Sequence, residues 1–313
     1  TQKLQPHTFI CLKFPLCTEF FAAEIGVWLS GNIAVPIIDS FPEERISQIS
    51  RHCDSPLTLS TDMFKENAGK PTDASQFAMP QDTDDALLIY TSGSTGAPKG
   101  ILHDFQSLNN AFCLYEDFNP TAADRFAYGA PINFISQLQY YLFVYGVEVH
   151  LLNSQTVRDV KSLAQYYTDH AITMTTISPA VLSIFKNTDK HLRCVWTGSE
   201  NVAGIGPQDF RLYNLYGSTE TGGPMCYAEI TEPSDNPSAG KPVAGIEYKI
   251  IDEEICFKGH FCKGYFKDEE RTHELYKDGW LHMGDLGRLL PNGDIQYINR
   301  KDWMVKINGQ RVE

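Results

Sequence analysis

The stretch Tyr90–Gly100, YTSGSTGAPKG, combines the residue types that bind phosphate groups. Its glycines lack Cβ atoms, so the backbone can adopt positive φ and approach a ligand closely. Successive N–H groups in such a turn form an anion-binding concavity. Hydroxyl groups and one lysine, whose point charge suits phosphate, complete the set. The glycines are Gly93, Gly96 and Gly100, and the donor side chains are Thr91, Ser92, Ser94, Thr95 and Lys99.

Spacing excludes two familiar phosphate loops. The Walker loop requires Gly-Lys-Ser/Thr after four residues, but Lys99 follows Pro98 and precedes Gly100. The dinucleotide fingerprint requires G-x-G-x-x-G, but Thr91 stands where the first glycine would be. A flexible Gly/Ser linker explains neither the apolar run before the loop nor its Pro-Lys-Gly ending. The stretch therefore indicates a phosphate loop of another type.

Strands and helices must position this loop. We expect a buried strand at Ala86–Tyr90, a short connector at Ile101–Phe105 and a helix at Ser107–Phe118. Alternating strands and helices on both sides predict a parallel sheet covered on both faces. The other expected strands are Thr8–Leu12, Gly31–Asp39, Phe126–Ala130, Val149–Leu152, Ile172–Ile177 and Arg193–Thr197. The other expected helices are Glu19–Ser30, Glu43–Cys53, Gln137–Tyr145, Val157–His170 and Pro179–Phe185.

Near Ala228 the sequence pattern changes from alternating strands and helices to turns and short strands. A turn-rich connector, Glu232–Gly245, precedes short strands, and Pro291–Asp294 is a predicted hairpin turn. These strands are expected at Glu247–Ile251, Glu254–Lys258, Asp285–Leu290 and Ile295–Asn299. We predict an α/β protein with a multilayer αβα core of parallel-rich sheets and a small antiparallel β-barrel-like subdomain. Residues 1–227 form the core of two stacked subdomains, 228–300 the small subdomain and 301–313 the start of a hinge.

Composition limits the partners. The 313 residues hold 26 basic and 39 acidic side chains, a formal charge of −13, which argues against a nucleic-acid surface. No apolar run approaches the ~18 residues of a membrane span. Eight cysteines without a C-x-x-C pattern suggest reduced thiols in a cytoplasmic protein. Five histidines show no Cys/His clustering along the sequence, and we expect none of them to be a metal ligand: His103, His150, His170, His191 and His282.

Four motifs occur in order along the chain. They are GNIAVPIIDSFPEERI from Gly31, YTSGSTGAPKG from Tyr90, LYNLYGSTET from Leu212, and the closing segment from Asp278 to Glu313. On these motifs the chain resembles the adenylate-forming superfamily, and most of all the adenylation domains of nonribosomal peptide synthetases and their stand-alone relatives. The resemblance implies a cytoplasmic ligase that uses ATP and Mg²⁺. It joins a carboxylic acid to AMP, releases pyrophosphate and passes the acyl group to the phosphopantetheine thiol of a carrier protein.

The resemblance also implies roles for individual residues. Thr91, Lys99 and Glu220 would be catalytic, with Glu220 holding the magnesium ion. Tyr216 would stack on adenine, Asp285 would accept from both ribose hydroxyls, and Asp302 would be the hinge aspartate. The full set expected to bind the nucleotide is Ser92, Gly93, Ser94, Thr95, Gly96, Gly198, Ser199, Glu200, Asn214, Tyr216, Gly217, Thr219, Asp285 and Arg300. Taken alone, Glu220 would be an ordinary solvated glutamate and Tyr216 a core tyrosine; the flanking motif favours the site roles.

The acid pocket departs from the family pattern. Members that activate α-amino acids carry an aspartate in a Phe-Asp-x-Ser segment, but in PINFISQLQYY the slot falls on Asn133, Phe134 or Ile135. Burying an ammonium group without a counter-charge costs several kcal/mol. We therefore expect an aryl, hydroxy, keto or short acyl acid, with an acidic group from elsewhere in the chain as the alternative. Further expected pocket residues are Leu138, Thr176, Val195, Thr197, Leu215 and Gly223.

The closing segment raises alternatives for the whole protein. The resemblance implies a C-terminal lid domain with a catalytic lysine after the hinge, and the printed sequence stops at Glu313. We expect the chain as printed to lack that lid and to bind nucleotide better than it turns it over. The alternatives are a stand-alone ligase of the D-alanine–carrier or acyl-CoA type, and a non-catalytic nucleotide-binding module. Lys99, Glu220 and Asp285 disfavour the module.

Overall fold

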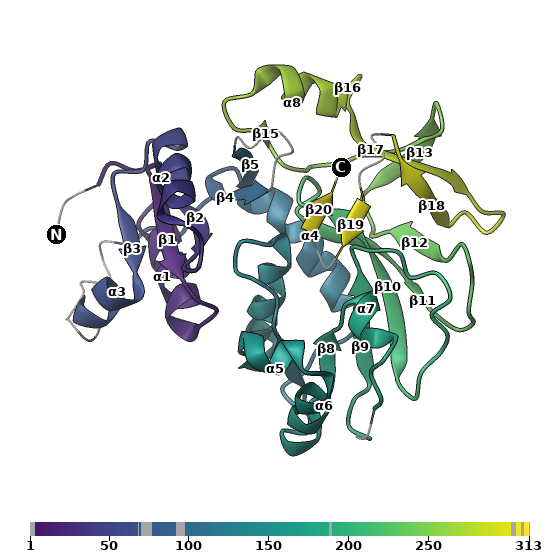
Figure 1. The fold of residues 1–313 in the computed structure, drawn as a ribbon. Coiled ribbons are helices and arrows are strands. Elements are labelled where there is room, and N and C mark those ends of the chain that lie inside the picture. Colours follow the sequence, from purple (N-terminus) through teal and green to yellow (C-terminus); the bar gives the residue numbers. More distant parts are fainter. Residues whose placement is uncertain are drawn as a thin grey trace.

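The computed structural model describes residues 4–67, 69, 77–91, 98–187, 190–301, 305–307 and 310–312. Within them the chain forms a six-stranded sheet, a twelve-stranded sheet and a short two-stranded ribbon of β19 (Val305–Ile307) and β20 (Gln310–Val312). Helices lie on and between the two large sheets (Figure 1). The predicted α/β class with parallel-rich sheets is confirmed.

The six-stranded sheet has the order β15-β5-β4-β2-β1-β3. Its parallel part consists of β1 (Phe9–Phe14), β2 (Ile33–Ile38), β3 (Thr58–Ser60) and β4 (Asp85–Thr91). Most positions of β1, β2 and β4 are buried, as expected for strands with both faces covered. The helices of this part are α1 (Thr18–Leu29), α2 (Glu43–His52) and α3 (Thr61–Asn67).

The expected connector Ile101–Phe105 is wrong, because most of it belongs to a strand. β5 (Lys99–Asp104) runs antiparallel to β4, with Thr91 opposite Lys99. Ile101 and His103 are buried in this strand, so their side chains add to the core. The following helix α4 (Phe105–Glu116) begins at Asp104, whose Oδ1 accepts a 2.9 Å hydrogen bond from the Ser107 N–H. β4 and β5 are thus antiparallel neighbours on either side of residues 92–97 of the predicted phosphate loop.

The twelve-stranded sheet is parallel at one end and antiparallel at the other. Its parallel strands are β7 (Glu148–Leu151), β6 (Arg125–Tyr128), β8 (Met174–Thr176), β9 (Cys194–Gly198) and β10 (Arg211–Ser218). Its antiparallel strands are β11 (Gly223–Glu229), β12 (Ser238–Pro242), β18 (Ile295–Arg300), β17 (Trp280–Leu289), β14 (Glu254–Lys258), β13 (Glu247–Ile251) and β16 (Tyr276–Lys277). The sheet is continuous across residue 227, so the predicted domain boundary falls inside β11.

Several expected elements differ in detail. The segment Ile135–Tyr145 is a 3₁₀ helix, η2, that ends at Gly146 in the left-handed conformation. The expected helix Val157–His170 is divided into α5 (Ser154–Arg158) and α6 (Val160–Asp169), because the Asp159 side chain caps α6. The expected helix at Pro179 is the short α7 (Pro179–Leu182). The Glu232–Gly245 connector contains β12, and α8 (Glu269–Leu275) was not expected.

One large hydrophobic cluster joins the two sheets. It combines Leu12 of β1 and Leu87 of β4 with Phe126 of β6 and Trp196 of β9. The buried faces of α1, α4 and η2 contribute to the same cluster. The sheets are also joined through the chain, because β15 (Gly264–Tyr265) pairs with β5 although it follows β14 in sequence. Residues of the small antiparallel part therefore reach the phosphate hairpin.

Candidate active site

The paired residues of the β4–β5 hairpin nearest the predicted phosphate loop, on either side of it, are Thr91 and Lys99. Thr91 ends β4 and Lys99 begins β5, directly opposite each other. The Thr91 Oγ1 atom is buried and has no hydrogen-bond partner among the described residues. Ser92, Gly93, Ser94, Thr95 and Gly96 lie outside the described residues, as does the hinge residue Asp302. The structure therefore describes the base of the predicted phosphate site.

Glu220 lies in a tight turn between β10 and β11. The Gly222 N–H donates to the Thr219 carbonyl, and the Ser218 N–H donates to Thr221 Oγ1 at 2.9 Å. Glu220 is only 5% exposed, and its Oε1 accepts a 2.9 Å hydrogen bond from the Tyr265 hydroxyl. Since Tyr265 belongs to β15, which pairs with β5, this contact brings Glu220 to the sheet that carries Lys99. One tyrosine thus joins the Glu220 turn to the strand that begins at Lys99.

Lys99 and Tyr265 also line a pocket of about 180 Å³. His52, Lys267 and Arg271 contribute basic side chains to its wall. Two of these bases are already paired, because Lys267 Nζ contacts Asp54 at 2.6 Å and Arg271 contacts Asp268 at 3.1 Å. The pocket shows that the stem of the hairpin is open on the side of β15.

His103 lies in β5 close to the Glu220 turn. Burial lowers the pKa of His103 to about 4, and the nearby Glu220 and Asp104 charges only partly oppose this shift. The imidazole is therefore neutral near pH 7, and its Nδ1 lies 3.0 Å from Ser107 Oγ. His103 is therefore a neutral polar side chain in the core.

Tyr216, Asp285 and Arg300 form a connected group. The Tyr216 hydroxyl donates to Asp285 Oδ2 at 2.7 Å, and Arg300 Nη1 lies 2.8 Å from Asp285 Oδ1. Asp285 and Arg300 are directly opposite each other on β17 and β18. Burial and the Asp285 charge raise the pKa of Tyr216 well above its ordinary value, so its hydroxyl remains a donor. Three of the residues expected at the nucleotide are thus in contact.

Close backbone approaches require glycine at two expected site positions. A Cβ atom at Gly198 would lie 2.2 Å from the Leu215 carbonyl oxygen, and Gly198 has a φ of +149°. A Cβ atom at Gly217 would lie 2.3 Å from the Gly223 carbonyl oxygen, beside a bulge in the β10–β11 pairing. Ser199 also has positive φ, at 66°, and is exposed. The ends of β9 and β10 are therefore held close by backbone packing.

The remaining nucleotide-site residues lie near these strand ends. Asn214 faces Thr197 across the β9–β10 pairing, but its Nδ2 donates to the Ser238 carbonyl at 2.9 Å. Asn214 could therefore contact an adenine through its side-chain oxygen Oδ1. To donate from Nδ2 instead, it would have to break the hydrogen bond to the Ser238 carbonyl. Glu200 follows Ser199 and is half-buried, and Thr219 lies in the turn of Glu220.

The expected acid pocket is partly assembled. Leu138 and Leu215 share one cluster with Ile135, and a Cβ atom at Gly223 would lie 3.8 Å from Ile135 Cγ1. Phe134 is 40% exposed, so among the three residues considered for the aspartate slot Ile135 is the one packed beside Gly223. Val195 is not brought to this group, because it is buried in a separate cluster with Leu163 and Tyr167.

Polar atoms are buried around the same segment. Thr176 Oγ1 donates to Gln139 Oε1 at 2.9 Å. Asn133 Oδ1 and Thr197 Oγ1 are buried without a hydrogen-bond partner among the described residues. Sequence reasoning missed Gln139, although a glutamine within the apolar run LQYYLFVY is an unusual core residue that could have been noticed. It also missed Tyr265, for which no local sequence signal exists.

The contacts join two sequence motifs across the sheets. The β4–β5 hairpin of one sheet is joined through Tyr265 to the turn that follows Tyr216 in the second sheet. The family model described as "AMP-binding enzyme" matches residues 2–265, and the chain belongs to this family. The resemblance inferred from the motifs is confirmed.

Curated relatives of the chain are much longer synthases. The chain is similar to bacitracin synthase 1 of Bacillus licheniformis, with 28% identity over 349 residues that cover 99% of this chain and 7% of that protein. It is similar to surfactin synthase subunit 2 of Bacillus subtilis, with 27% identity, 94% coverage of this chain and 9% of that protein. The chain therefore spans less than a tenth of the length of these two relatives.

Solved structures share the fold. An adenylation–carrier didomain, McyG A-PCP in complex with phenylalanyl-adenylate, superposes with a TM-score of 0.84 at 18% identity, covering 99% of this chain and 69% of that one. The fused NpsA-ThdA didomain from Klebsiella oxytoca gives a TM-score of 0.86 at 18% identity, covering 99% and 72%. The N-terminal domain of FACL13 from Mycobacterium tuberculosis gives 0.81 at 19% identity, covering 95% and 87%. Across the described part of this chain, no helix has the length and apolar character needed to cross a bilayer.

Proposed function

We propose that the chain is the large part of an enzyme that activates a carboxylic acid with MgATP, for transfer to the phosphopantetheine thiol of a carrier protein. The acid's carboxylate attacks the α-phosphorus, the bond to the bridging oxygen breaks, and pyrophosphate leaves. The observation that carries the proposal is the short segment Tyr216–Glu220. Its tyrosine contacts the expected ribose aspartate Asp285, and its glutamate lies against β15 beside the phosphate hairpin.

The chain's own residues supply positioning and charge, which dominate phosphoryl-group chemistry. Lys99 neutralises the departing pyrophosphate from the hairpin stem. Asp285 accepts from the ribose hydroxyls, a role that suits an ionised carboxylate because it only accepts. Glu220 fits a magnesium ligand because it is a buried carboxylate that accepts from the neutral hydroxyl of Tyr265. A hard cation there would neutralise phosphate charge through oxygen ligands.

The pocket supports an acid without an α-ammonium group. Ile135 packs beside Gly223 and offers no counter-charge. A buried acidic residue, Glu24, contacts η2 and accepts from the hydroxyl of Tyr141. Burial raises the pKa of Glu24 to about 8, so it is mostly uncharged at pH 7 and is a poor counter-ion. The Thr176–Gln139 pair instead offers hydrogen bonds for an oxygen substituent on a hydroxy, keto or aryl acid.

Pyrophosphate exchange by the full-length protein, scanned across amino, hydroxy, keto and aryl acids, tests the proposal. We expect exchange with an acid that lacks the α-ammonium group. The Ile135→Asp variant should gain exchange with α-amino acids, whereas Phe134→Asp, at the exposed neighbouring position, should not. A clear preference of the wild type for an α-amino acid would refute the pocket assignment while leaving the adenylation reaction intact.

A stand-alone ligase is a second candidate because a fatty acyl CoA synthetase from Mycobacterium tuberculosis shares the fold, with a TM-score of 0.82. To distinguish a carrier-dependent enzyme from an acyl-CoA ligase, the activated acid is offered to coenzyme A or to a carrier protein, and the transfer of the acyl group to each is measured. Transfer to coenzyme A alone would favour the acyl-CoA ligase. Tight ATP binding with no exchange for any acid would instead favour a non-catalytic nucleotide-binding module.

A further inference from the structure

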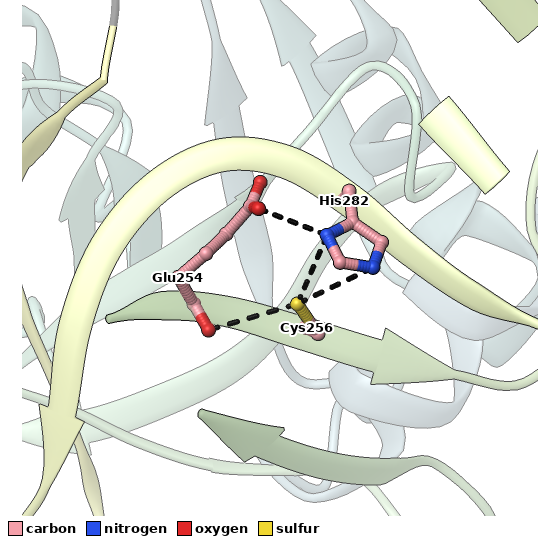
Figure 2. Close-up of side chains that lie close together, drawn as sticks. All are labelled: Glu254, Cys256 and His282. Carbon is pink, nitrogen blue, oxygen red and sulfur yellow. Dashed lines mark hydrogen bonds and ion pairs between the residues drawn. The ribbon is translucent and has the colours of Figure 1, made fainter. Parts of the chain in front are cut away.

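Glu254, Cys256 and His282 form a compact cluster outside the expected nucleotide site (Figure 2). Their ligand atoms all lie within 4.8 Å of one another. His282 Nδ1 is 2.8 Å from Glu254 Oε2 and 3.4 Å from Cys256 Sγ. Glu254 and Cys256 are buried, and His282 is partly exposed. Solvent therefore reaches the cluster from the side of His282.

The sheet register builds this cluster. Glu254 and Cys256 are two residues apart on β14, so their side chains lie on the same face of the strand. His282 of β17 is directly opposite Cys256. This explains why the sequence analysis did not expect His282 to be a ligand: the residues are separated along the chain and meet only through strand pairing. Three potential ligands on paired strands are held more precisely than ligands on loops.

The three side chains are a donor set that Zn²⁺ takes in proteins: an imidazole nitrogen, a thiolate sulfur and a carboxylate oxygen. Cys256 Sγ lies 3.4 Å from His282 Nδ1 and 3.8 Å from His282 Nε2, so the sulfur lies over the imidazole ring. The imidazole must therefore rotate for one ion to contact both the sulfur and Nδ1. The carboxylate is oriented from outside the cluster, because Glu254 Oε1 accepts a 2.6 Å hydrogen bond from the Gly284 N–H. Such an outer contact is typical of metal-ligating carboxylates.

A lysine ammonium already contacts the carboxylate of the cluster. Lys301 Nζ lies 2.8 Å from Glu254 Oε2, and its side chain is 47% exposed. The ammonium can therefore move into solvent while the Lys301 N–H keeps its hydrogen bond to the Gly284 carbonyl. Lys301 is the residue before Asp302, the expected hinge residue. A cation bound by the cluster would displace the Lys301 side chain from Glu254, next to the expected hinge residue Asp302.

We propose that Glu254, Cys256 and His282 bind a thiophilic divalent cation, Zn²⁺, in competition with the Lys301 ammonium. On binding, Cys256 loses its thiol proton to solvent and coordinates as thiolate. The proton that His282 Nδ1 donates to Glu254 is released to solvent, Nε2 carries the ring proton, and Nδ1 coordinates the ion. Glu254 contributes Oε2, and water completes the shell, as in zinc sites with three protein ligands. In this site, three protein ligands hold Zn²⁺, and Zn²⁺ competes with the Lys301 ammonium for Glu254.

Zinc titration of the purified chain against a chromogenic chelator tests this site without any activity measurement. We expect Cys256→Ser and His282→Gln each to weaken Zn²⁺ binding by about tenfold or more, since even outer-contact changes cost that much. Cys113→Ser is the matched control, because Cys113 is an exposed cysteine away from the cluster. Co²⁺ substitution should give a thiolate-to-metal charge-transfer band that disappears in Cys256→Ser and persists in Cys113→Ser.

Lys301→Met is the decisive variant, because it leaves all three ligands in place and alters a half-exposed side chain. Removing the competing ammonium should tighten Zn²⁺ binding, whereas Lys263→Met, which breaks the ion pair with Asp85, should not. Unchanged or weaker binding in Lys301→Met would overturn the competition. Lack of the cobalt band in the wild type, or zinc affinity unaffected by Cys256→Ser, would overturn the site.

Discussion

The carboxylate of Asp285 is held by two side chains. The Tyr216 hydroxyl and Arg300 Nη1 each contact one of its oxygens. These contacts fix the carboxylate in the middle of β17, opposite Arg300 on β18. A ribose would meet an acceptor that is already oriented, which reduces the entropic cost of binding.

Asp285→Ala should weaken binding of a nonhydrolysable ATP analogue by about tenfold to a hundredfold, because a hydrogen bond to a charged group contributes about 1.5–3 kcal/mol. Isothermal titration calorimetry measures this directly. Glu247→Gln, which alters an exposed acidic residue paired with Lys258, is the control and should bind normally. Unchanged affinity in Asp285→Ala would remove Asp285 from the ribose site.

Glu220→Gln should lower pyrophosphate exchange by the full-length protein about a hundredfold or more, because it removes the charge that would hold Mg²⁺. Tyr265→Phe keeps that charge and removes only the hydroxyl that contacts Glu220, so its loss should be much smaller. Comparing exchange rates across a magnesium titration distinguishes the two variants. Equal losses would mean that Glu220 acts through its contact with Tyr265 and not through a metal.

At the scale of elements, the turn between β10 and β11 depends on backbone contact. Gly217 lies where the two strands bulge, and the carbonyl of Gly223 approaches too closely for any side chain. The turn that carries Glu220 thus has little freedom to shift. The same is true at the end of β9, where Gly198 meets the Leu215 carbonyl.

Gly217→Ala should lower the free energy of unfolding by about 3 kcal/mol, because the added Cβ forces the strands apart. Gly26→Ala provides the contrast: Gly26 lies in α1, and a Cβ atom added there would have no neighbour within 4 Å. This variant should gain up to about 1 kcal/mol from higher helix propensity. Urea unfolding monitored by circular dichroism measures both. A Gly217→Ala variant as stable as the wild type would contradict the close approach.

Elements with strong local patterns were predictable, and those defined by distant partners were not. The apolar strands β1, β2 and β4 and the helices α1 and α2 were predicted within a few residues. β5 was missed because its strand character depends on pairing with β4 and with the distant β15. In the site, the motifs assigned Tyr216 and Asp285 to the same nucleotide, and the structure places the two side chains in contact. Tyr265 and Gln139 were missed because only the tertiary fold brings them to Glu220 and Thr176.

At the scale of the whole molecule, a carboxyl group is buried where the two sheets meet. Glu24 belongs to α1 of the first sheet and accepts from Tyr141 of η2, which packs on the second. Burial raises the pKa of Glu24 from its ordinary 4.5 to about 8, against the lowering effect of the Tyr141 hydrogen bond. The folded protein therefore keeps a proton that the unfolded chain releases at lower pH.

This proton makes stability depend on pH. The contribution of Glu24 is fully present below pH 4.5 and is lost as pH rises toward 8, with a slope of at most about 1.4 kcal/mol per pH unit. Glu24→Gln keeps an acceptor for Tyr141 but cannot ionise, so the variant should gain stability over the wild type as pH rises. Glu44→Gln, at an exposed position of α2, should follow the wild-type curve. Parallel curves for wild type and Glu24→Gln would contradict the raised pKa.

The pairing of β5 with β15 also has a consequence for biosynthesis. The edge of β5 beside the glycine-rich hairpin is completed by residues that leave the ribosome long after it. Until they arrive, the nascent sheet presents unpaired backbone groups that can recruit strands from other chains. Truncations that end before Gly264 should therefore aggregate during expression, whereas chains that reach beyond Tyr265 should be protected. β15, whose Tyr265 contacts Glu220, would then also protect the edge of β5, but only late in translation.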